Sequence, residues 1–125
     1  MKRNLDLVRE ILLAVEGFEP TTLSTIQRLS PKDFSGSEPQ NLYHIRMLID
    51  AGLLKPAGDR SMRGEYPVGG MTMEGHDFLD AIKEQAVWDK TKTRVGDVGA
   101  WTLDIVLAVA KDEIKRRLGL ALGGF

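Results

Sequence analysis

The sequence predicts an α+β fold of the winged helix-turn-helix class, with a small antiparallel wing hairpin and a C-terminal helical extension. Three observations predict this class. An N-terminal helical pattern is followed, after a polar segment, by a second helix with a clear cap at Ser37. Two short apolar segments come directly after this helix, joined by a polar turn that contains glycine. The rest of the chain carries helical patterns separated by glycines.

The first helix is predicted from apolar residues at helical spacing between Leu5 and Val15, and Gly17 is a natural stop. The segment from Thr21 to Leu29 fits a short strand through its β-branched residues, and it also fits a weak helix. Residues 30–39 hold two prolines and a glycine, which predicts a turn or a single helical turn there.

The second helix has the sharpest start. Ser37 stands three residues before Gln40, as in a capping box, and Pro39 fits the first turn. This helix should run to Ala51 and end at Gly52. The side that faces the core should carry Leu42, Ile45, Leu48 and Ile49, and the opposite side Gln40, Tyr43, His44 and Met47.

A hairpin should follow, with strands at 53–55 and 66–71 around the polar turn GDRSMRGE. Thr72 is placed to cap a further helix that continues through residues 73–92, with Gly75 allowing close packing in its first turn. A last helix should start near Trp101. We expect one winged-helix core at 1–86 and a C-terminal helical extension at 87–125, packed on that core or on a second copy.

The composition excludes several kinds of protein. The chain has 125 residues, 42% of them hydrophobic and 28% charged, which is ordinary for a folded domain. It has no cysteine and only two histidines, so we expect no disulfide, no metal and no cofactor. No apolar run is long enough to cross a bilayer, and no signal peptide is visible. The sequence therefore predicts a cytoplasmic protein that does not bind a membrane. The net charge of −1 gives nucleic-acid binding no general support.

If the hairpin is a wing, the helix after Ser37 is the one that enters the major groove of DNA. Glutamine pairs with adenine, while tyrosine, histidine and arginine bond phosphate oxygens. The predicted DNA-binding residues are therefore Gln40, Tyr43, His44, Arg46 and Met47 on this helix, with Lys55, Arg60 and Arg63 at the wing. A solvated helix face and a plain surface loop explain the same residues, because Asp59 and Glu65 interleave with the wing cations.

No set of residues with catalytic chemistry is visible. His76 lies beside Glu74 and Asp77, but no nucleophile, paired carboxylate or phosphate-binding loop accompanies it. We therefore expect neither an enzyme nor catalytic residues. Trp88 and Trp101 flank a turn with two glycines and are expected to anchor the last helix.

The last helix predicts a homodimer. Residues 103–110 are apolar around almost the whole helix apart from Asp104, whereas packing on a single core needs one stripe. The predicted dimer-interface residues are Leu103, Ile105, Val106 and Val109. The alternative is that one subunit covers this helix on both sides.

The segments MKRNLDLVREILL, YHIRMLIDAGLL, MTMEGHDFLDAI and VWDKTK together resemble a family of uncharacterised bacterial and prophage proteins classed as a domain of unknown function. They are also similar to the YjcQ-type phage proteins. The resemblance covers most of the chain, and it implies a winged-helix fold with a helical C-terminal extension and no catalytic residues. The stretch from Thr21 to Pro39 departs from the pattern by being longer and more polar, which leaves open the second helix of a helix-turn-helix.

Two functions follow as hypotheses: a dimeric DNA-binding regulator of transcription, or a winged-helix module that docks on a protein, as a phage or host-factor adaptor would. The neutral charge favours the second. The positions of the cations separate the two, because a single basic face favours DNA and scattered cations favour a protein partner. The cations concerned are Arg28, Arg46, Lys55, Arg60 and Arg63. A third class, a small hydrolase or nuclease, lacks the residues.

Overall fold

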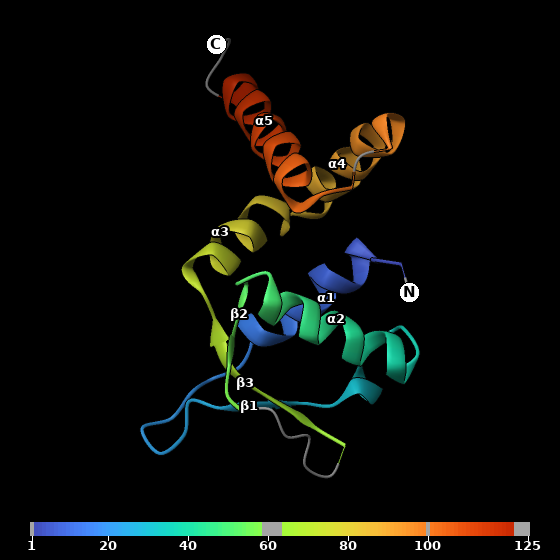
Figure 1. Ribbon diagram of the computed structural model, residues 1–125. Coiled ribbons are helices and arrows are strands. Elements are labelled where there is room, and N and C mark those ends of the chain that lie inside the picture. The colour runs from blue at the N-terminus through green and yellow to red at the C-terminus, as the bar shows by residue number, and fades with distance from the viewer. Residues whose placement is uncertain (1, 59–63, 100, 122–125) are drawn as a thin grey trace. The chain divides into compact units, whose positions relative to one another are not determined.

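The fold is α+β, as predicted, and its arrangement is compatible with a winged-helix-like protein (Figure 1). The computed structural model describes residues 2–58, 64–99 and 101–121. The helices are α1 (Leu5–Glu16), the 3₁₀ helix η1 (Pro31–Asp33), α2 (Glu38–Asp50), α3 (Met73–Ile82), α4 (Gln85–Val98) and α5 (Leu103–Ala121), and the strands are β1 (Gln27–Leu29), β2 (Leu54–Pro56) and β3 (Tyr66–Met71). The chain divides into two compact units, Met1–Asp77 and Phe78–Phe125, a boundary earlier than the one expected between 86 and 87.

Helix α1 forms where its pattern predicts it. The side chain of Asn4 caps it by accepting a hydrogen bond from the Leu7 amide at 3.2 Å. Gly17 is its C-cap. The apolar stripe is buried, which makes this helix the largest contributor to the core of the first unit; its buried residues are Leu5, Leu7, Val8, Ile11, Leu12 and Val15.

The ambiguous segment after α1 is a strand only at its end. Residues 27–29 form β1, and the residues before them form a turn in which the Thr21 amide donates to the Ser24 carbonyl at 2.9 Å. The Thr21 hydroxyl accepts from the Ser24 amide at 3.1 Å, which is the local bonding that threonine offers in place of regular structure. The single helical turn predicted for residues 30–39 is η1.

The sheet has the strand order β1-β3-β2, and both pairs are antiparallel. Leu29 faces Tyr66 and Gln27 faces Val68 in one pair, while Leu54 faces Met71 in the other. The predicted hairpin is therefore confirmed as β2 and β3, with a register irregularity in β2. Helices α1 and α2 contact the sheet through β3 and β2 (Figure 1).

The corner between β3 and α3 is tightly packed. Thr72 caps α3, as predicted, by accepting a hydrogen bond from the Gly75 amide at 3.0 Å. Its hydroxyl also donates to the Gly52 carbonyl, and its amide donates to the Leu53 carbonyl at 3.0 Å. A Cβ atom on Gly75 would lie 2.1 Å from the Leu53 carbonyl oxygen, so only glycine fits there.

The continuous helix predicted over 73–92 is wrong. Helix α3 ends at Ile82, and Glu84 caps α4 by accepting a hydrogen bond from the Val87 amide at 2.8 Å. The burial pattern gives the reason. An unbroken helix would carry the stripe of Phe78, Leu79 and Ile82 on to Ala86 and Asp89, which are exposed. The break moves the buried stripe of α4 to Val87, Trp88, Thr91 and Val95.

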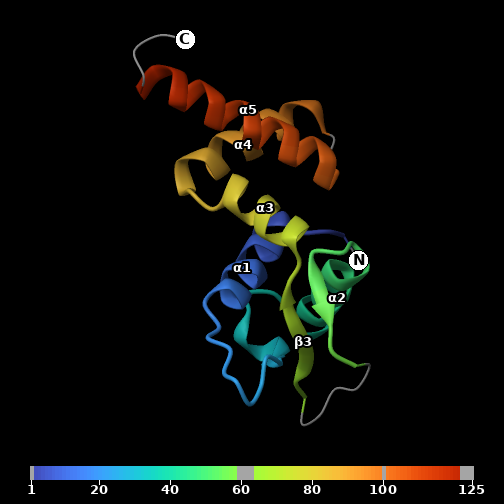
Figure 2. The same ribbon diagram turned by 90° about the vertical axis from the view of Figure 1, so that its left-hand side faces the viewer.

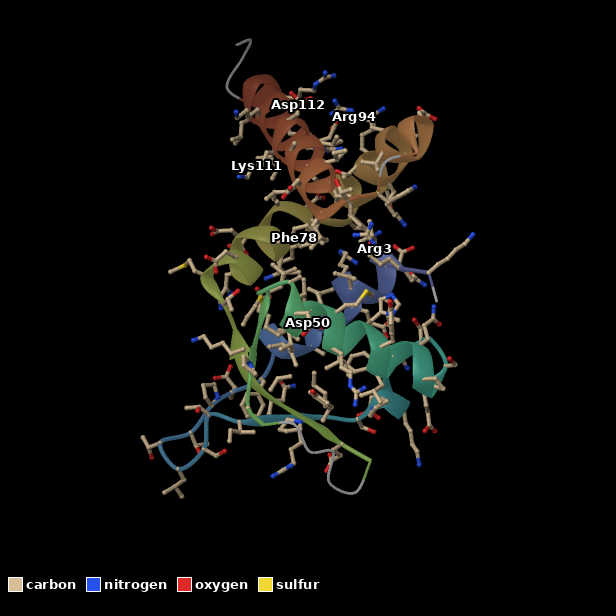
Figure 3. The ribbon with its side chains drawn as sticks, in the orientation of Figure 1. Arg3, Asp50, Phe78, Arg94, Lys111 and Asp112 are labelled. Atoms are coloured by element: carbon tan, nitrogen blue, oxygen red, sulfur yellow. The ribbon has the colours of Figure 1, made fainter. Side chains whose placement is uncertain are left out.

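In the second unit, α4 ends at Gly99 in the left-handed conformation, and Thr102 caps α5. The two helices pack together, and Arg94 of α4 lies between Asp112 at 2.9 Å and Glu113 at 3.0 Å on α5 (Figure 3). The hydrogen bond from Arg94 lowers the pKa of the Asp112 carboxyl, and the same bond raises the pKa of Arg94. These ion pairs join α4 to α5 near the surface of the second unit.

The expected anchors and dimer residues of this unit fall into different environments. Trp88 is buried, whereas Trp101 is 37% exposed with its ring close to Gly96 of α4, so their role as anchors of the last helix stays a prediction. Val106 was expected at a dimer interface, but it is fully buried within the single chain together with Ala110, four residues on. Leu103 and Val109 are half-buried, and Ile105 is 38% exposed.

We predict that Gly75→Ala lowers the free energy of unfolding by about 2 kcal/mol, because the added methyl group overlaps the Leu53 carbonyl. Urea denaturation measures this. Gly17→Ala is the matched control, since its nearest neighbour would lie 3.6 Å from the new Cβ. Equal stability of the two variants would contradict the close approach.

Candidate nucleic-acid interface

The candidate interface is built on α2, whose two ends are fixed by local hydrogen bonds. The Ser37 side chain accepts from the Gln40 amide at 3.2 Å, which confirms the predicted cap. At the other end, the Leu53 amide donates to the Leu48 carbonyl at 2.9 Å and the Gly52 amide to the Ile49 carbonyl at 3.0 Å. Gly52 has φ +78°, so this end is a Schellman motif.

Asn41 joins α2 to the irregular segment before it. This side chain is fully buried, and the two N–H groups of its Nδ2 are shared among three carbonyls, those of Pro31 at 2.6 Å, Phe34 at 3.1 Å and Gly36 at 2.9 Å. Glu10 of α1 holds the same segment by accepting from the amide and the hydroxyl of Ser35. The segment thus has a fixed shape without a regular helix. Our sequence analysis missed both residues; the signal was an asparagine inside a helix, where it is unfavourable unless its side chain is bonded.

His44 does not lie on the exposed face where we predicted it. The ring is fully buried; its Nε2 accepts from the Asn4 amide at 2.8 Å, and its Nδ1 pairs with the Gln40 carbonyl at 2.8 Å. Because Nε2 accepts, Nδ1 carries the proton and the ring is neutral. The residue therefore ties the start of α1 to α2, and DNA cannot reach it.

Other predicted residues of α2 do reach the surface. Tyr43 is 42% exposed, Arg46 is exposed, and Gln40 and Met47 are half-buried. The Arg46 guanidinium lies over the ring of Tyr66, 5.7 Å from its centre, and so stands at the root of the wing. The exposed side of α2 and the base of the hairpin are thereby brought together.

A hollow of about 360 Å³ lies between the first turns of α2 and the base of the wing. Its lining is mostly apolar, with one carboxylate, and consists of Pro31, Glu38, Pro39, Leu42 and Gly64. Glu38 thus places a negative charge at the end of the helix that would enter a DNA groove. This hollow suits an apolar side chain better than a phosphate.

The predicted cations that the structure describes, together with Lys32, fall into two groups. Arg46 on α2 and Lys32 on η1 are exposed on elements that pack together. Pro67 and Gly69 are two residues apart on β3 and therefore lie on the same face of the sheet. Arg28 pairs with Pro67 and Lys55 lies against Gly69, so these two cations share that face. Arg60 and Arg63 lie outside the described residues. The described cations therefore do not form one face.

The chain belongs to the DUF2513 family. The family model, described as "Hypothetical protein (DUF2513)", matches residues 2–101. An uncharacterized protein of Haemophilus influenzae is 34% identical over 122 residues, which cover 94% of this chain and 99% of that protein. No solved structure matches the chain. Membership in a family of unknown function is thus confirmed, while the likeness to the YjcQ-type phage proteins stays a prediction.

In residues 2–58, 64–99 and 101–121, no group of three or more histidine and acidic side chains is arranged to hold a metal ion. No helix in these ranges is long and apolar enough to cross a membrane.

We predict that His44→Ala lowers the free energy of unfolding by about 3 kcal/mol, through the cavity it leaves and the Asn4 amide that loses its acceptor. Thermal and urea unfolding measure the change. The control is the second histidine, His76, which is exposed, so His76→Ala should change stability by no more than about 0.5 kcal/mol. A small effect of His44→Ala would show that the ring is replaceable there.

Proposed function

We propose that this chain is a winged-helix DNA-binding protein that regulates transcription in the cytoplasm of a bacterium, from a chromosomal or prophage gene. The observation that supports the proposal is the placement of α2 beside the root of the β2–β3 hairpin, with the Arg46 guanidinium over Tyr66 where they meet. A helix and a wing that are adjacent in this way can contact one DNA duplex together.

In this proposal, α2 lies in the major groove and the wing contacts the backbone. Tyr43 and Arg46 are the exposed side chains that reach DNA, with Gln40 and Met47 at the edge of the contact. Lys32 and the wing residues Arg60 and Arg63 neutralise phosphates. Asn41 and His44 act from inside by fixing the position of α2, which lowers the conformational cost of binding.

We predict that Arg46→Ala, and separately Arg60→Ala with Arg63→Ala, weakens binding to all DNA sequences and lowers the slope of log K against log salt by about one per lost contact. Fluorescence anisotropy on mixed genomic fragments at several salt concentrations measures both. Lys90→Ala is the control, an exposed cation of the second unit whose loss should leave the slope unchanged. A slope unaffected by either arginine variant would refute the assigned phosphate contacts.

The small number of cations near α2 makes a homodimer part of the proposal, because two copies double the contacts on one duplex. The surface that we assign to the partner is on α5, where Ile105 is exposed and Leu103 and Val109 are half-buried. Ile105 and Val109 are four residues apart and lie on the same side of the helix.

We predict that the chain sediments as a dimer at micromolar concentration, and that Ile105→Glu combined with Val109→Glu gives a folded monomer, because the charges cannot be buried in the contact. Circular dichroism confirms that the variant is folded. Lys111→Glu, a charge reversal on the same helix, should leave the dimer intact. A monomer of the unchanged chain would refute the dimer.

The second candidate function is a winged-helix module that binds a protein. The apolar hollow at Leu42 and Pro39, with Glu38 at its edge, favours it, as does the separation of the cations into two groups. The DNA titration separates the candidates. If the folded chain does not bind DNA even at about 50 mM salt, where phosphate contacts are strong, DNA binding is excluded and the second candidate stands.

A further inference from the structure

Strand β3 is longer than the strand that pairs with one of its edges. β1 pairs with Tyr66–Val68 only, whereas β2 reaches Met71 on the other edge. Beside residues 69–71, the structure describes no strand on the β1 side. Peptide groups alternate between the two edges of a strand, so this short edge offers backbone hydrogen-bonding groups to an incoming chain.

A groove of about 450 Å³ is lined by Gly69, Gly70 and Met71 of β3. It is lined by the end of α1, by the loop that follows it, by β3 and by side chains from β2 and α3. Figure 2 shows the loop between α1 and β1, in light blue, on the α1 side of β3. We call this groove the edge groove, and its lining residues are Val15, Glu16, Phe18, Pro20, Thr25, Lys55, Gly69, Gly70, Met71 and His76.

The sequence keeps the groove open in two ways. Gly69 and Gly70 carry no side chains, and Gly70 has φ +101°, a conformation that favours glycine, so the backbone of β3 remains accessible. On the facing side, the turn closed by Thr21 and Ser24 carries the loop away before it can continue β1 along β3. This turn presents Leu23 at 96% exposure, and Ile26 is 44% exposed on the same loop.

The lining also has a polar end. Lys55 is exposed, and no ion pair joins it to a carboxylate among the described residues. His76 is also exposed there. Glu16 is already engaged in an interaction of its own. The edge groove therefore combines an open strand edge, an apolar wall and a free cation.

We propose that the edge groove binds an extended segment of another protein, which adds to β3 as a strand in line with β1. The backbone of the segment pairs with Gly69–Met71, one of its apolar side chains fills the hollow beside Phe18 and Pro20, and a carboxylate of the segment lies at Lys55. The edge groove is separate from the exposed side of α2, so this partner binds whether or not α2 binds DNA.

The test uses a phage-displayed library of nine-residue peptides selected on the full chain, followed by fluorescence anisotropy with a synthetic copy of the enriched peptide. Enriched peptides should alternate apolar β-branched residues with polar ones and carry an acidic residue. Thr25→Trp fills the groove from an exposed position, and it should weaken binding at least about tenfold. Lys55→Glu should also weaken binding.

Thr22→Trp is the matched control, because Thr22 is exposed on the same loop and does not line the groove. It should bind like the unchanged chain. No enrichment, or equal binding by both tryptophan variants, would overturn the proposal. It is also overturned if Thr25→Trp converts a sedimenting dimer to a monomer, because a second copy then occupies the edge. DNA binding by Thr25→Trp should be unchanged, so this proposal and the proposed function fail separately.

Discussion

The carboxamide of Asn41 holds the part of the fold on which the rest of the first unit depends. Its Nδ2 meets three backbone carbonyls in a segment that has only one turn of 3₁₀ helix, and these carbonyls would otherwise be without side-chain donors. The Oδ1 atom has no hydrogen-bond partner among the described residues, a cost that the three contacts offset. This side chain therefore ties the start of α2 to η1, in addition to the Glu10–Ser35 bonds that hold the same segment to α1. His44, one turn further along, does the same toward α1.

Hydrogen bonds between residues that are close in the sequence made much of the fold predictable. The caps at Ser37 and Thr72 and the stop at Gly52 depend on residues within one turn of the helix end, and all three hold in the structure. The break at Glu84 was missed because glutamate is a good helix former, and its capping role follows only from the shift in the buried stripe. Hydrogen-bond partners that are distant in the sequence could not be predicted from local patterns.

We misplaced His44 on the exposed face of α2 because its partner is also distant in the sequence. The buried side of α2 runs through Asn41, His44, Ile45 and Leu48 at spacings of three and four, which is an ordinary helical stripe. Two of its members are polar, so an analysis by hydrophobicity rotated the helix toward Leu42 and Ile49, which are half-buried. The partner of His44, the Asn4 amide, is forty residues away in the sequence, so the pattern of α2 alone did not identify the burial of this ring. The candidate site was therefore predicted for the correct helix, but not for every side chain on it.

The corner at Gly52, Leu53 and Thr72 connects α2 to the hairpin without any spare linking residues. The Schellman motif ends at Leu53, β2 begins at Leu54, and the Leu53 carbonyl already receives the Thr72 amide while Gly75 packs against it. One inserted residue there would send each side chain of β2 to the opposite face of the sheet. The loop between α1 and β1, which contains the turn at Thr21, is not tied in this way to the register of a strand. Foreign sequence such as an epitope tag or a reporter domain can therefore be accommodated in that loop, whereas the corner does not accept an insertion.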